Sequence, residues 1–206
     1  GYTVESVVQQ GKGFRVNNQA FDAVICTLSS PIIPKVTPQL FSANYLSRFN
    51  KLKFLHAVCL VFETKRKLLE TTYWLNVCAP DNKIMGAMQH TNFQDKKYYG
   101  GNHLAYVYNY VEFSDPRIRM DKEQLIKFYL PELKKINPEF KINSKKTYVF
   151  KGPFAQPIFD AEFLTNKPDF ETPVKNFYIA NLDMTYPYDR GTNYAVKLGK
   201  EVSNFF

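Results

Sequence analysis

The sequence predicts an α+β fold, with an antiparallel or mixed β-sheet flanked by helices. Four strand-like stretches, at 54–63, 72–78, 84–89 and 103–111, are separated by turns rich in Lys, Gly, Asn and Asp. A helical pattern follows them, so the order of elements is not a regular strand–helix alternation. The 206 residues are 45% hydrophobic and 22% charged, which predicts a globular chain of one large or two small domains.

The first residues predict a small meander that leads into a central strand. Strands are expected at 2–8 and 14–16, with turns at Gly11 and Asn17. The nearly all-apolar run at 21–27 predicts a strand buried on both faces.

Two helices are expected before and after the four central strands. Thr37 and Pro38 suit the N-cap and first turn of a helix that runs to about Phe49. Asp121, with Gln124 three residues later, predicts the start of the second helix. Pro131 is expected to break or restart that second helix, and another strand is expected at 147–150.

The last thirty residues predict a strand, a polar loop and a helix. The strand is expected at 177–180 and the loop at 181–190. The helix should begin at Gly191, with Thr192 or Asn193 as its cap. Gly199 lies on its apolar face, where a missing side chain would let the helix approach a sheet closely.

The net charge of +8 and the pI near 9.2 raise the question of an anionic partner. The longest basic runs are 65–67 and the spaced lysines at 141, 145 and 146. No recognition helix or Arg-rich arm accompanies them, so they are interpreted as solvated faces without a nucleic-acid partner.

The three cysteines, Cys26, Cys59 and Cys78, are widely spaced and lie in apolar or strand-like contexts. They predict buried, reduced thiols, a cytoplasmic location and no zinc site. No signal peptide or membrane-spanning run is expected.

The start of the last helix is the first candidate for chemistry. A helix N-terminus favours an anion, and a reduced flavin gains negative charge at its pyrimidine end. Gly191, Thr192 and Asn193 could stabilise that charge, although such an ending also suits an ordinary capped helix.

Residues 179–183 and 186–199 resemble the C-terminal flavin motif of the amine-oxidase superfamily. The most specific block is Asp-Arg-Gly-Thr-Asn-Tyr-Ala-Val at 189–196. The chain is especially similar to a bacterial branch of protoporphyrinogen-oxidase-like and UDP-galactopyranose-mutase-like flavoproteins. Segments 73–76, 90–93, 99–104, 129–131 and 148–157 extend the likeness along nearly the whole chain.

The resemblance implies FAD as cofactor, bound by residues near the ends of two strands. Asn181 takes the place of the family's Gly, and Asp183 is the leading candidate for the ribityl contact. Arg190 and the helix start at 191–193 would meet the ring. Thr27 could touch the cofactor or could only cap its strand.

A Gly-x-Gly-x-x-Gly turn that opens a helix is absent from the sequence. The adenine and pyrophosphate site is therefore expected in an upstream dinucleotide-binding segment of the same protein, which also suits a first residue other than Met. This chain alone is expected to bind FAD weakly or not at all.

Polar residues at strand ends are the candidates for substrate binding and catalysis. Trp74, Asn76, His90 and Tyr188 are expected to contact substrate, and His90, Asn92 and Tyr186 are the candidates for a catalytic role. A His there could serve as acid or base, or could be a structural hydrogen-bonded residue. No nucleophile elbow supports a Ser/His/Asp triad, because Ser29 and Ser30 precede a proline.

These observations predict three parts: 1–33 and 173–206 from an FAD-binding domain, and 34–172 from a substrate domain. The preferred function is FAD-dependent oxidation of a small organic substrate, with hydride transfer to the flavin. One alternative is a flavin-dependent nucleotide-sugar mutase, because the basic charge would suit the diphosphate of its substrate. The other is a non-catalytic domain that keeps the fold.

Overall fold

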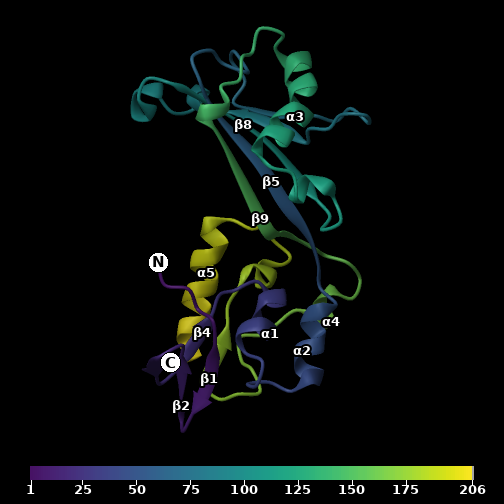
Figure 1. The fold of residues 1–206 in the computed structure, drawn as a ribbon. Helices are drawn as coiled ribbons and strands as arrows, with labels where there is room; N and C mark the ends of the chain where they lie inside the picture. Colours follow the sequence, from purple (N-terminus) through teal and green to yellow (C-terminus); the bar gives the residue numbers. More distant parts are fainter. Residues whose placement is uncertain (206) are drawn as a thin grey trace. The chain divides into compact units, whose positions relative to one another are not determined.

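The computed structural model describes residues 1–205, which form two compact units (Figure 1). The first unit comprises 1–53 and the segment that begins at Pro157, and the second comprises 54–156. By their contacts, residues 34–53 and 157–172 belong to the first unit, although the sequence-based division groups them with the middle of the chain. The α+β fold predicted from the sequence is confirmed.

The first unit contains two small sheets. An antiparallel meander is formed by β1 (Val7–Gln10), β2 (Gly13–Val16) and β3 (Gln19–Phe21). The second sheet is a parallel pair, β4 (Val24–Cys26) with β10 (Phe177–Ile179). The strand predicted at 2–8 begins only at Val7, because the Asn17 side chain instead binds the preceding segment, accepting from the Glu5 and Ser6 amides.

Short helices connect these strands. In the first half they are η1 (Ser30–Ile32), α1 (Ile33–Val36) and α2 (Ala43–Asn50); in the second they are α4 (Phe163–Asn166), η6 (Leu182–Thr185), α5 (Thr192–Val202) and η7 (Ser203–Phe205). The predicted helix start at Thr37 is wrong, because α2 begins at Ala43. The Thr37 hydroxyl donates to the Ile33 carbonyl at the end of α1, and Ser42 caps α2 by accepting from the Tyr45 amide.

The second unit is built on a five-stranded sheet in the order β6-β7-β8-β5-β9. Its strands are β5 (Lys53–Thr64), β6 (Trp74–Asn76), β7 (Gly86–Gln89), β8 (His103–Val111) and β9 (Thr147–Ile158). The pairs β5–β8, β6–β7 and β7–β8 are antiparallel. Four 3-10 turns, η2 (His90–Asn92), η3 (Lys96–Tyr99), η4 (Pro116–Ile118) and η5 (Ser144–Lys146), link the elements.

Helix α3 (Lys122–Ile136) covers one face of this sheet (Figure 1). Asp121 and Gln124 form the predicted capping box. The predicted break at Pro131 is wrong, because α3 continues through it. A proline removes one helical hydrogen bond, and here the buried Tyr129 and Leu133 on either side hold the helix against the core.

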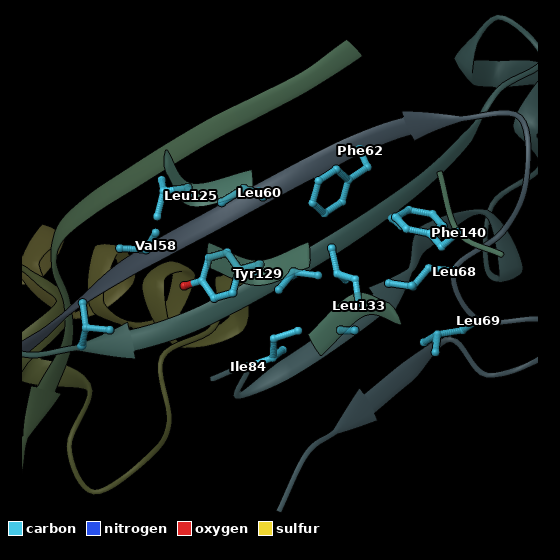
Figure 2. Close-up of a cluster of buried hydrophobic side chains, with 14 residues drawn as sticks. Val58, Leu60, Phe62, Leu68, Leu69, Ile84, Leu125, Tyr129, Leu133 and Phe140 are labelled. Carbon is cyan, nitrogen blue, oxygen red and sulfur yellow. The ribbon is translucent and has the colours of Figure 1, made fainter. Parts of the chain in front are cut away.

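The core of the second unit lies between α3 and the sheet. Figure 2 shows Leu125, Tyr129 and Leu133 of α3 gathered with Val58, Leu60 and Phe62 of β5. Alternate residues of β5 and β8 enter this core, as expected for a sheet with one covered face. The opposite face of the sheet is therefore available for other contacts. Within residues 1–205, none of the helices has the length and apolarity needed to cross a bilayer.

Substituting Leu133 with Ala should destabilise the second unit by about 2–5 kcal/mol, because the side chain is fully buried. Urea unfolding followed by circular dichroism measures the change. Leu130→Ala is the matched control, since Leu130 is in the same helix but 36% exposed. Equal losses from the two substitutions would contradict the assigned core.

Candidate functional site

A groove in the first unit brings together several residues that the sequence singles out. It has a volume of about 500 Å³ and lies between α5 and the carboxyl ends of β4 and β10. Thr27, Asn181 and Gly191 all line it. The remaining lining is mostly apolar: Ile25, Ala180, Leu182, Thr185, Ala195, Leu198, Gly199 and Val202. An apolar groove with a few polar groups at one end suits an organic ligand.

The start of α5 opens onto this groove at Gly191, which is the N-cap. The predicted cap at Thr192 or Asn193 is wrong: within residues 1–205, no side chain caps this helix. The amides of Tyr194 and Ala195 bond to the Gly191 carbonyl. The amides of Thr192 and Asn193 remain as first-turn donors, which favour an anion or a partly negative oxygen.

Gly199 has a different role from the one predicted. Apart from its chain neighbours and the backbone of its own helix, a Cβ added at Gly199 would meet no described atom within 4 Å. The glycine therefore widens the groove instead of letting α5 pack closely on the strands.

Asn181 and Asp183 are held in a buried network with Ser30. The Asn181 side-chain amide donates to the Leu28 carbonyl at 2.9 Å and to the Ser30 hydroxyl at 3.0 Å. The Ser30 hydroxyl donates in turn to Asp183 Oδ2, and the Ser30 backbone amide reaches the same oxygen at 3.3 Å. This network ties the end of β10 to the turn that follows β4.

Asp183 is fully buried, with 0% of its surface exposed. Burial raises the pKa of its carboxyl, although the hydrogen bonds from Ser30 oppose the shift. Its Oδ1 has no hydrogen-bond partner within residues 1–205. Asp183 is absent from the groove lining, so its contacts here are those of a structural anchor, whereas Asn181 does reach the groove.

The loop before α5 contains the two predicted tyrosines and Arg190. Tyr188 stacks on Tyr194 with 4.7 Å between ring centroids. Tyr186 instead packs against Phe159 and Phe163 of the same unit. Arg190 Nη1 lies 3.7 Å from Asp189 Oδ1, a surface pair that contributes little to stability.

In the second unit, Trp74 and Asn76 are part of an aromatic cluster on the uncovered face of the sheet. The Trp74 Nε1 donates to Asn76 Oδ1 at 2.8 Å, and the Tyr108 hydroxyl lies 3.4 Å from the same oxygen. The Tyr108 ring lies over Gly86, where an added Cβ would be 2.4 Å from the tyrosine oxygen. We call Trp74, Asn76, Tyr106 and Tyr108 the aromatic face.

His90 adjoins the aromatic face. Its ring lies 5.7 Å from that of Tyr106, centroid to centroid, and its Nε2 is 2.7 Å from the Tyr99 hydroxyl. Asn92 is bound elsewhere: its amide donates to the Leu69 and Thr72 carbonyls. Of these two catalytic candidates, His90 is therefore the one next to a surface that could hold a ligand.

Sequence reasoning missed Tyr106, Tyr108 and Gly86. A signal for the tyrosines was present, since 106, 108 and 110 are all Tyr and alternate residues of a strand share a face. Gly86 gave no such signal, because its requirement for a missing side chain comes from a ring on the neighbouring strand.

The cysteines are only partly as expected. Cys26 is buried, but Cys59 is half-buried and Cys78 is exposed. Burial raises the pKa of the Cys59 thiol to about 11, which disfavours the nucleophilic thiolate. In the described chain, no three His, Cys, Asp or Glu side chains form a group that could hold a metal ion.

The chain combines a groove at the start of α5 with a unit built on a five-stranded sheet, and comparison with known families identifies its class. The family described as flavin containing amine oxidoreductase matches residues 1–204. The chain therefore belongs to this family. A search of curated proteins gave no significant match.

Solved structures share this fold at low sequence identity. A protein from Exiguobacterium sp. 255-15, provisionally assigned as a protoporphyrinogen oxidase, has a TM-score of 0.70 and 12% identity, over 98% of this chain and 45% of that chain. An oxidoreductase from Methanosarcina mazei has a TM-score of 0.63 and 19% identity, over 86% and 43%. A reduced UDP-galactopyranose mutase has a TM-score of 0.63 and 14% identity, over 80% and 36%. This chain thus spans less than half the length of each.

Asp183→Asn should change how stability depends on pH. The raised pKa means that the folded state holds the carboxyl proton more tightly than the unfolded chain. The contribution of Asp183 to the free energy of unfolding is therefore fully present below the ordinary pKa of 3.8, where the carboxyl is protonated in both states. It is lost as the pH rises through the pKa of the folded state. The Asn variant, which stays neutral, should lose less stability between acid and neutral pH.

Urea unfolding at a series of pH values tests this expectation, with Asp189→Asn as the exposed control. The same pH dependence in wild type and Asp183→Asn would contradict the raised pKa of Asp183.

Gly86→Ala should displace the Tyr108 ring and disturb the neighbouring Trp74. Trp74 is the single tryptophan in the sequence, so its fluorescence reports on the aromatic face directly. We expect a shifted emission maximum for Gly86→Ala. Gly152→Ala is the matched control, because an added Cβ there meets its nearest atom at an ordinary 3.7 Å. Unchanged emission in Gly86→Ala would contradict the ring placement.

Proposed function

We propose that the full-length protein is an FAD-dependent oxidoreductase that oxidises a small organic substrate. The observation that carries this proposal is the uncapped start of α5, which opens onto a groove between α5 and the ends of β4 and β10. Membership of the flavin-containing family supports a flavin as the ligand. A bound flavin would supply a two-electron acceptor for hydride from the substrate.

The residues at the groove fit the pyrimidine end of a flavin. The amides of Thr192 and Asn193 would donate to its carbonyl oxygens, and the positive end of α5 would favour the charge that reduction adds. The missing side chain at Gly191 keeps the approach open. Thr27, exposed at the end of β4, and Asn181 would border the ribityl side. Arg190, in the loop before α5, would lie at the ring end of the flavin. Asp183 would act indirectly, by anchoring β10.

The first unit would be one part of the FAD-binding domain. A parallel pair of only two strands is unusual, since parallel sheets are normally larger and covered on both faces. Ile25 of β4 is 43% exposed, and a second apolar groove of about 330 Å³ runs along β4. An upstream dinucleotide-binding segment would cover these surfaces and hold the adenine and pyrophosphate. Without it, the 206-residue chain should retain FAD weakly or not at all.

The second unit would bind the substrate on its aromatic face. Trp74 and Tyr108 offer ring surfaces, and Asn76 offers a carboxamide to a polar group on the substrate. His90, held by Tyr99, is our candidate for accepting the proton that accompanies hydride loss. Tyr188 and Tyr186 of the first unit would have supporting roles at the ring end of the groove.

A nucleotide-sugar mutase is the less favoured alternative. Such an enzyme needs cations that converge on a diphosphate next to the flavin, and the linings of the two apolar grooves of the first unit contain neither Lys nor Arg. Arg117 is bound by Asp115, with Nη2 2.6 Å from Oδ2, and Arg48 donates to the Thr165 and Lys167 carbonyls. These arginines are thus engaged locally. The absorption spectrum of the purified full-length protein distinguishes a non-catalytic domain from both enzymes. Bound flavin absorbs at about 450 nm, and a protein without that absorbance would be the non-catalytic domain.

Gly191→Val should reduce flavin retention by the full-length protein, because the added side chain obstructs the start of α5. An added Cβ at this position already lies 2.7 Å from Asn193 Oδ1. The ratio of visible to ultraviolet absorbance after gel filtration measures retention, and a loss of about tenfold in affinity is expected for each hydrogen bond to a charged group that is lost. Val196→Ala, exposed on the same helix, should retain flavin. Full retention by Gly191→Val would refute the role assigned to this helix start.

A further inference from the structure

The two longest basic runs of the sequence, which we interpreted as solvated faces, meet at one cleft in the second unit. This cleft has a volume of about 350 Å³. Lys65 and Arg66 come from the segment after β5, and Lys141 and Lys146 from the segment before β9. The runs converge because β5 and β9 are neighbours in the sheet.

The cleft carries a net positive charge. Glu63 is its one acidic lining residue, and this carboxylate is already engaged. Its Oε1 accepts from the Lys146 ammonium, in an ion pair of 2.5 Å, and from the side-chain amide of the buried Asn102. The described ion pairs include none for Lys65, Arg66 or Lys141.

Further cations lie nearby. Lys67 and Lys96 are both close enough to His103 to lower the pKa of its imidazole, in addition to the larger effect of its burial. His103 pairs with Thr64 at this same end of the sheet. Glu70 is close enough to His103 to act on its pKa in the opposite direction. Like charges gathered around a cavity repel one another, and a bound anion relieves that repulsion.

We propose that this cleft binds a phosphate group, with Lys65, Arg66 and Lys141 as its cationic ligands and Lys146 held in place by Glu63. Arg presents paired donors that match phosphate oxygens, and Lys adds point charges. The Asn102 side chain forms part of the polar wall. Its lining shares no residue with the α5 groove or with the aromatic face, so this proposal does not depend on flavin binding.

Binding of inorganic pyrophosphate to the 206-residue chain tests the site, by isothermal titration calorimetry and by the rise in melting temperature that a ligand produces. Replacing Lys65, Arg66 or Lys141 singly with Gln should weaken binding about tenfold, the value of one charge-assisted contact. The triple variant should show no measurable binding. These side chains are exposed, so the fold should be retained, which circular dichroism verifies.

A charge-matched control separates a built site from general attraction. Lys12, Lys127 and Lys200 are exposed and lie outside the cleft, and replacing all three with Gln gives the same net charge as the cleft triple variant. This control should bind pyrophosphate as wild type does. Equal loss of binding in both triple variants, or no binding by the wild type, would overturn the proposal.

Vesicles identify the source of the phosphate. Co-sedimentation with phosphatidylcholine vesicles that contain phosphatidylserine, lost in the cleft variant and competed by pyrophosphate, would support a lipid headgroup as ligand. Pyrophosphate binding without vesicle binding would support a free phosphate compound. Vesicle binding that the cleft variant retains, together with no pyrophosphate binding, would contradict the site.

Discussion

The anchoring of β10 to the turn after β4 is the interaction on which the candidate cofactor site depends. Ser30 and Asp183 are separated by 153 residues in sequence, yet the Ser30 hydroxyl and amide both donate to one buried carboxylate oxygen. Asn181 closes the same network onto the Leu28 carbonyl. Because η6 and the loop to α5 follow directly, this network fixes where the last helix begins. The chemistry proposed for that helix start therefore rests on a buried acid whose neutral form the fold favours.

The two units differ in how much of their apolar surface is covered. In the second, α3 and the sheet bury a continuous apolar core between them, which leaves the other face of the sheet free to carry aromatic side chains. In the first, two apolar grooves that are both lined in part by β4 remain open. A surface of that kind is costly in water and is expected where a further segment or a ligand binds. This difference supports the proposal that the first unit binds the cofactor and the second binds the substrate.

The sequence predicted the central strands well, since alternation and turn residues are local signals. The strands β5, β6, β7 and β8 and the capping box of α3 are found where expected. Errors arose where tertiary contacts override local preference. Thr37 resembles a cap but ends a helix by bonding to Ile33, and Pro131 is tolerated because the core holds α3. Among the site residues, the network through Ser30 and the requirement for Gly86 could not be predicted, because both depend on partners that are distant in sequence.

In the proposed cofactor site, the backbone amides at the start of α5 meet the pyrimidine end of a flavin. A crystal structure of the full-length protein with FAD bound tests it most directly. We expect the Thr192 or Asn193 amide nitrogen to lie within hydrogen-bonding distance, about 2.7–3.2 Å, of an oxygen or nitrogen of the pyrimidine ring. A flavin ring bound away from α5, with these two amides facing water or other protein groups, would contradict it.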